Sequence, residues 1–175
     1  ILLLIDVSGS MTAQTDGALR FAHALVRAGE RVEVFTLGTR LTRVTSALRL
    51  RRREAALDAA SGLVADWDGG TRLGEALQAF LAVPRFAGFA RGAAALILSD
   101  GLERGGPEAM VDAVRRLSRL AWRVDWLTPL ALGPGFAPRT AALEAASPWI
   151  DAFAPGGSVK AMCAHALALA QERRA

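Results

Sequence analysis

The chain has 175 residues, 52% of them hydrophobic, with 7 prolines and a formal net charge of +4. This length and apolar content exclude a disordered chain and predict a single globular domain that covers residues 1–175. The opening apolar run ends at Asp6, and no other run approaches the roughly 20 residues that span a bilayer. We therefore expect a soluble domain without a membrane span.

Cysteine and asparagine usage bears on the cellular compartment. Cys163 is the one cysteine, so no internal disulfide forms, and the absence of Asn excludes an N-glycosylation site. Both features favour the cytoplasm. Ile1 already lies inside an expected strand, without an initiator Met or a basic leader segment before it, which suggests a domain excised from a longer protein.

The positive charge is almost entirely arginine, with Lys160 as the single lysine. The one dense cluster is Arg49, Arg51, Arg52 and Arg53. It has no interleaved aromatic residues and matches no nucleic-acid-binding motif, so nucleic acid is not the expected partner. Cations oppose the dipole of a helix at its N-terminus, and the cluster precedes an expected helix. The cluster is interpreted as a solvated surface or as a surface on which a protein partner docks, and this unfavourable position adds support to docking.

Apolar runs bounded by turn residues alternate with segments of helical period, which is typical of a parallel sheet covered by helices. The expected strands are Leu2–Ile5, Val32–Leu37, Leu41–Val44, Ala93–Leu98, Arg123–Leu127 and Pro148–Phe153. The third strand is short and alternates polar with apolar residues, so it is expected at a sheet edge. The pattern predicts an α/β fold.

Helices are expected between these strands. They are Asp16–Ala28, Glu54–Trp67, a helix starting just after Thr71, a helix starting near Pro107, a short helix near Ala141–Ala146, and Ser158–Ala170. The first is nearly apolar all round, which predicts burial on most of its sides. Cys163 falls on the apolar face of the last helix and is expected to be an inert core residue.

Small oxygen-bearing residues follow the ends of the expected strands. Asp6, Ser8 and Ser10 follow the first strand, Thr71 follows a Gly-Gly break, and Asp100 follows the run "ALILS". Taken singly, each has an ordinary alternative, because Ser10 or Thr71 could cap a helix and Asp100 could form a turn with Gly101.

Taken together, the two carboxylates and three hydroxyls are hard oxygen ligands that suit Mg²⁺, with Mn²⁺ or Ca²⁺ as other occupants. They are expected at the carboxyl ends of the strands, where open α/β sheets bind ligands. Neutral hydroxyl ligands leave the ion electrophilic, so a Glu or Asp carboxylate from a protein partner would complete the site. The set therefore predicts binding rather than catalysis.

The motifs "DVSGS", "GGT" and "LSDG" resemble the three parts of the metal-ion-dependent adhesion site of the von Willebrand factor A (VWA) domain. The resemblance implies that Ser8 and Ser10 ligate the metal through their hydroxyls and Thr71 directly or through water. It implies that Asp6 and Asp100 act mainly through water. It also implies a doubly wound, mostly parallel sheet with one antiparallel edge strand and helices on both faces.

Two further stretches, "VDWLTPL" and "AALEAASPWIDAFAPGGSVKAM", resemble the CoxE-like branch of bacterial VWA proteins. Thr128 replaces the asparagine usual in that branch, and Gly156-Gly157 replaces a His-Asn pair. The resemblance implies an intracellular adaptor that works with a MoxR-type AAA+ ATPase in metalloenzyme maturation. The best-known case is molybdenum-containing carbon monoxide dehydrogenase.

Other functions fit the sequence less well. No G-x-S-x-G elbow surrounds Ser8 or Ser10, and His23 and His165 fall inside expected helices, so we expect no hydrolase and no other enzyme. The chain lacks a G-x-x-x-x-G-K-[ST] phosphate-binding loop, and its cysteine and histidine count excludes a Cys/His zinc site. The remaining alternative is an extracellular adhesion or matrix-binding VWA module.

Overall fold

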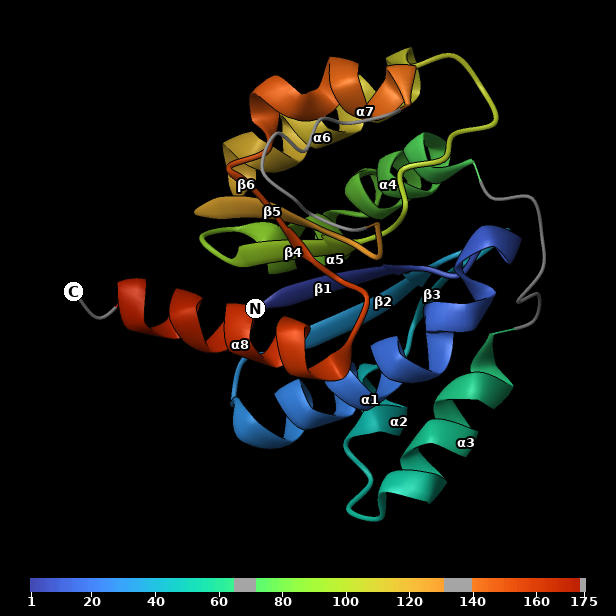
Figure 1. The fold of residues 1–175 in the computed structure, drawn as a ribbon, viewed down its shortest axis with the longest axis vertical. Coiled ribbons are helices and arrows are strands. Elements are labelled where there is room, and N and C mark those ends of the chain that lie inside the picture. Colours follow the sequence, from blue (N-terminus) through green and yellow to red (C-terminus); the bar gives the residue numbers. More distant parts are fainter. Residues whose placement is uncertain (65–71, 131–139, 174–175) are drawn as a thin grey trace.

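The computed structural model describes residues 1–64, 72–130 and 140–173 and shows a six-stranded sheet with helices on both faces (Figure 1). The strands are β1 (Leu2–Asp6), β2 (Glu33–Leu37), β3 (Leu41–Arg43), β4 (Ala94–Leu98), β5 (Arg123–Thr128) and β6 (Ala152–Pro155). Their order is β3-β2-β1-β4-β5-β6, and every neighbouring pair is parallel except β2 and β3. The predicted doubly wound sheet with one antiparallel edge strand is confirmed.

The helices divide between the two faces of the sheet (Figure 1). They are α1 (Thr12–Ala28), α2 (Thr45–Leu48), α3 (Arg53–Leu63), α4 (Leu73–Ala82), α5 (Pro84–Ala90), α6 (Glu108–Leu120), α7 (Ala141–Ala146) and α8 (Val159–Glu172), with 3₁₀ turns η1 (Gly9–Met11) and η2 (Ser147–Trp149). One apolar core lies under α1, α2, α3 and α8, and a second lies under α4 to α7. No helix in the described ranges has both the length and the apolar character that a bilayer crossing demands.

Strand β1 shows why a continuous apolar run forms the centre of this sheet. Its side chains alternate between the cores, with Leu3 and Ile5 in one and Leu2 and Leu4 in the other, and all four are fully buried. A parallel strand covered on both faces needs apolar residues at every position. Burial of the strand on both faces leaves its carboxyl end as the place where polar groups reach the surface.

Three predicted elements differ from the structure. The first helix begins at Thr12 rather than Asp16 because η1 leads directly into it, and α1 buries one face instead of most sides. The last strand is Ala152–Pro155 rather than Pro148–Phe153, since the backbone N–H of Ile150 closes the η2 turn on Ser147. The second predicted helix, Glu54–Trp67, ends at Leu63 in the structure because the backbone of Val64 is extended, and residues 65–67 lie outside the described part of the chain. The short helices α2 and α5 were not predicted.

The side chains of α8 make two contacts that the sequence pattern does not reveal. Cys163 is half-buried against the α1 side of the core rather than a full core residue. His165 bonds through Nε2 to a carboxylate oxygen of Asp125 at 2.7 Å, and the Nε of Arg123 donates to the other oxygen at 2.8 Å. Asp125 is fully buried, so these bonds compensate its carboxylate and fasten α8 to β5. His165 therefore has a structural role.

Candidate metal centre

The candidate metal centre lies between the carboxyl ends of β1 and β4. Asp6 is the last residue of β1, and Ser99 and Asp100 directly follow β4. These two strands are neighbours, with Ile5 opposite Leu98. Strand order reverses between them, since β2 and β3 continue from β1 while β5 and β6 continue from β4. The fold thus brings Asp6 and Asp100 together at the switch point where open α/β sheets bind ligands.

Asp6 is held on both carboxylate oxygens. Its side chain is 1% exposed, Oδ1 accepts a hydrogen bond from the backbone N–H of Ser8 at 2.9 Å, and Oδ2 accepts one from Ser99 Oγ at 2.6 Å. Burial raises the pKa of Asp6, these hydrogen bonds partly oppose that rise, and the nearby charge of Asp100 adds to it. A bound cation would relieve both the desolvation and the repulsion.

The two serines of "DVSGS" lie in the connection from β1 to α1. Ser8 Oγ and Ser10 Oγ are 3.2 Å apart, so the two hydroxyls form one oxygen cluster beside Asp6. Neither serves as a helix cap, because Ser8 makes no side-chain capping bond to η1 and the residue preceding α1 is Met11. The capping alternative for Ser10 is wrong, which leaves both hydroxyls available to a ligand.

Asp100 also forms the tight turn named as its ordinary alternative. Its Oδ1 accepts a hydrogen bond from the backbone N–H of Leu102 at 3.0 Å, and Gly101 has a φ of +77°. This left-handed conformation suits glycine, and a Cβ there would approach Leu143 Cδ2 to 2.7 Å. The turn fixes the backbone beside Asp6. Thr71, the fifth predicted ligand, lies outside the described residues.

Ser99 belongs to the site although the sequence pattern did not indicate it. Ser99 is fully buried, donates through Oγ to Asp6, and accepts from the backbone N–H of Gly101 at 3.0 Å. The indole N–H of Trp126 donates to its carbonyl oxygen at 3.0 Å. Ser99 thus links the carboxyl ends of β1, β4 and β5. Its place in "LSDG" was visible, but its partner lies 93 positions away.

We expect Ser99→Ala to lower Mg²⁺ affinity about tenfold, because a group that orients a metal-binding carboxylate contributes on that scale. Titration calorimetry measures this affinity, and circular dichroism checks the fold. Ser118→Ala is the matched control, since Ser118 donates to the carbonyl of Arg115 within α6, away from the site. Equal Mg²⁺ affinity in Ser99→Ala and wild type would contradict the positioning role.

The donor set fits a divalent cation that is bound through hydroxyl and carboxylate oxygens. Among the described residues, no three His, Cys, Asp or Glu side chains gather into a metal-binding group. An ion here would therefore depend on Ser8, Ser10 and water together with Asp6 and Asp100. These are hard oxygen donors, which Mg²⁺ prefers and which allow it to keep several waters.

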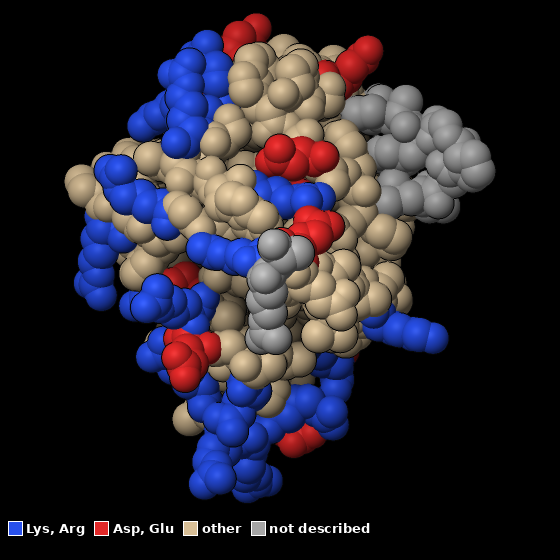
Figure 2. Space-filling view, turned by 90° about the vertical axis from the view of Figure 1, so that its left-hand side faces the viewer, with Lys and Arg blue, Asp and Glu red and all other residues tan. Residues whose placement is uncertain are grey.

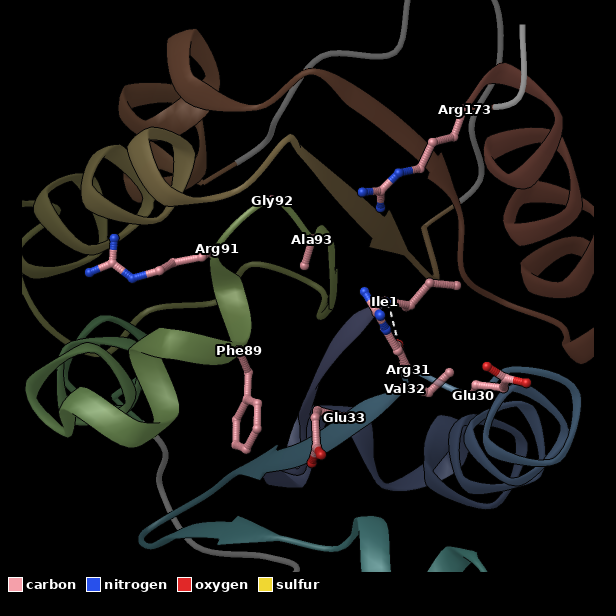
Figure 3. Close-up of a pocket in the computed structure, with 10 residues that line it drawn as sticks. All are labelled: Ile1, Glu30, Arg31, Val32, Glu33, Phe89, Arg91, Gly92, Ala93 and Arg173. Carbon is pink, nitrogen blue, oxygen red and sulfur yellow. Dashed lines mark hydrogen bonds between the residues drawn. The ribbon is translucent and has the colours of Figure 1, made fainter.

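A cavity of about 470 Å³ lies at the other end of the sheet, beside the starts of β1 and β2 (Figure 3). Its lining mixes Glu30 and Glu33 with Arg31 and Arg173, and the Arg91 guanidinium points away from it. The described residues that line the cavity include none of Asp6, Ser8, Ser10 and Asp100. The candidate metal centre lies at the carboxyl end of the sheet and is separate from this cavity.

A family model described as "VWA domain containing CoxE-like protein" matches residues 1–162. The chain belongs to this family. The match covers Asp6, Ser8, Ser10, Thr71 and Asp100 and extends to the start of α8. The predicted VWA domain and its CoxE-like branch are therefore confirmed. A search of curated proteins found no match.

Solved structures share the fold of this CoxE-like domain. A von Willebrand factor type A protein from Catenulispora acidiphila has a TM-score of 0.63 at 18% identity, over 92% of this chain and 39% of that one. BatB from Bacteroides thetaiotaomicron has a TM-score of 0.59 at 16% identity, and the match covers 99% of this chain and 98% of BatB. Proximal thread matrix protein 1 from the mussel byssus has a TM-score of 0.55 at 14% identity, and the match covers 90% of this chain and 44% of that protein. Its metal-ion-dependent adhesion site (MIDAS) motif is occupied by zinc. The chain thus spans under half the length of the first of these proteins.

Proposed function

We propose that this CoxE-like VWA domain is a divalent-metal-dependent protein-binding module. The observation that carries the proposal is the fixed oxygen cluster. Asp6 is held by Ser8 and Ser99, and the hydroxyls of Ser8 and Ser10 lie 3.2 Å apart beside it, free of capping bonds. Mg²⁺ is the proposed ion, with Mn²⁺ or Ca²⁺ as alternatives. Zinc belongs in the test because a fold relative has a zinc-occupied MIDAS motif.

The bound ion would supply an electrophilic centre for an anionic ligand. Asp6 and Asp100 are both buried and are proposed to act on the ion mainly through water. Ser8 and Ser10 would bind the ion directly, but their hydroxyls carry no charge. The positive charge of the ion would therefore be only partly neutralised by the protein. A Glu or Asp carboxylate of a partner protein would add the missing charge. The domain itself has no proposed catalytic residue, because its role is to capture that carboxylate.

The finer proposal is an intracellular adaptor for a MoxR-type AAA+ ATPase in metalloenzyme maturation. Membership of the CoxE-like family supports it. The chain has no phosphate-binding loop of its own, so ATP-driven work would come from the partner. An extracellular matrix-binding role is the alternative. The mussel thread matrix protein shares the fold, but 14% identity extends the likeness no further.

Affinity capture from the native organism, with Mg²⁺ or with EDTA, tests the proposed function. We expect the domain to retain a protein partner only with the metal, and to bind Mg²⁺ or Mn²⁺ weakly alone and more tightly with that partner. Calorimetry with Mg²⁺, Mn²⁺, Ca²⁺ and Zn²⁺ measures the second point. Partner capture that is equal in EDTA, tight stoichiometric zinc, or turnover of ATP or an ester would overturn the proposal.

A further inference from the structure

Five consecutive exposed residues form what we call the cationic surface: Arg49, Leu50, Arg51 and Arg52, which connect α2 to α3, and Arg53, which begins α3. Leu50 is 45% exposed and stands in the middle of the arginines in sequence. Figure 2 shows basic side chains crowding the lower end of the molecule, where the α2–α3 connection lies in Figure 1. An exposed apolar side chain is thus surrounded by positive charge.

The backbone of the cationic surface is held in place. The N–H of Leu50 donates to the carbonyl of Ala47 at 3.2 Å, and the Leu50 carbonyl lies 3.2 Å from Nε2 of the buried His23. Leu48, just before the surface, is fully buried. A ligand would therefore meet side chains on a fixed backbone, which reduces the entropy lost on binding.

The charge of the cationic surface is only partly compensated within the domain, where Glu33 is near enough to attract Arg49 and Glu54 near enough to attract Arg52. Arg53 forms an exposed pair with Glu54 at 3.2 Å, and no ion pair involves Arg49, Arg51 or Arg52 in the described part of the chain. The positive end of the α3 dipole lies at Arg53 and adds to the repulsion. Such crowding does not stabilise the fold, and it leaves positive charge that can attract an external anion.

We propose that the cationic surface docks an acidic segment of a partner protein, with an apolar side chain of that segment covering Leu50. The charge is complementary to carboxylates, and Leu50 offers the apolar contact that a phosphate backbone would not use. Glu54 and Asp58 follow the cationic surface on α3, so a long polyanion laid along this helix would meet repulsion. The residues also include no aromatic side chain for stacking on bases.

This contact is separate from the metal centre. Helix α3 has 11 residues and thus spans about 16 Å, with the cationic surface at its N-terminal end. Its other end points toward the edge of the sheet where β1 ends (Figure 1). The domain can therefore hold one partner through the metal and another through the arginines. Docking on the cationic surface does not require the metal, so it can be tested independently of the proposed function.

The test measures binding of a fluorescent acidic peptide, with Glu at most positions and Leu at every third, by anisotropy in EDTA. We expect Arg51→Glu with Arg52→Glu to weaken binding at least about tenfold, and added salt to weaken wild-type binding. Leu50→Ser should weaken binding several-fold without changing the salt dependence. Exposed residues away from the surface supply controls: Arg85→Glu with Arg91→Glu for charge, and Leu63→Ser for Leu50.

Circular dichroism and thermal melting check that the variants fold. If Arg51→Glu with Arg52→Glu does not fold, Arg51→Gln with Arg52→Gln replaces it in the binding test. Equal peptide binding by the wild type and the folded Arg51/Arg52 variant would overturn the inference. So would an equal loss in the Arg85/Arg91 control. Tighter Arg51-dependent binding to a single-stranded DNA oligonucleotide or to phosphatidylserine vesicles than to the peptide would show that the partner class is wrong.

Discussion

Asp6→Asn and Ser8→Ala are each expected to abolish metal-dependent partner capture while the domain stays folded. Asp6 is the carboxylate that Ser8 and Ser99 hold at the end of β1, and the Ser8 hydroxyl is part of the oxygen cluster. Loss of either group should lower Mg²⁺ affinity by at least about tenfold, since even outer partners of a metal contribute that much. Calorimetry and partner capture with and without EDTA measure the two effects.

The fold should tolerate Asp6→Asn because burial and Asp100 both disfavour the carboxylate of Asp6 in the metal-free domain. Asparagine keeps an oxygen for the Ser8 N–H and removes that charge. We therefore expect the metal-free variant to melt no lower than the wild type. Asp58→Asn and Ser46→Ala, two exposed positions on α3 and α2, are the matched controls. Unfolding of Asp6→Asn would show that Asp6 is structural, and capture equal to that of the controls would show that these residues do not hold the partner.

The largest expected loss of stability comes from Gly74→Ala in the first turn of α4. A Cβ there would overlap the backbone nitrogen of Met110 and lie 2.8 Å from the carbonyl carbon of Ala109, both at the start of α6. Backbone atoms cannot move aside as a flexible side chain can. We expect a loss of about 3 kcal/mol in the free energy of unfolding, or about 5–10 °C in melting temperature.

Gly62→Ala is the control for this substitution. Gly62 lies near the end of α3, and a Cβ there would meet nothing within 4 Å. The change should be neutral or stabilise by up to about 1 kcal/mol, because glycine loses more backbone entropy than alanine in a helix. Thermal melts of both variants measure the difference. Equal melting temperatures would mean that α4 and α6 do not pack as closely as the structure shows.

Much of the fold and of the candidate site could be predicted from local sequence. Strand β1 has to be apolar at every position because both faces are covered, and this makes a buried parallel strand visible as a continuous run. The same burial forces polar groups to the strand ends, so Asp6, Ser8, Ser10 and Asp100 stood out at one edge of the sheet. Short helices such as α2 carry too few turns to show a period, and they escaped prediction.

By itself, the sequence determined the alternation of strands and helices, the edge position of β3 and the position of the candidate oxygen donors after the strands, because each depends on neighbouring residues. Only the tertiary structure decided which groups orient those donors. Ser99 meets Asp6 across 93 positions, and His165 meets Asp125 across 40. It also decided that β6 follows the η2 turn, where pairing with β5 sets the register. Such contacts depend on strand order and register, and a local period contains no information about partners so far along the chain.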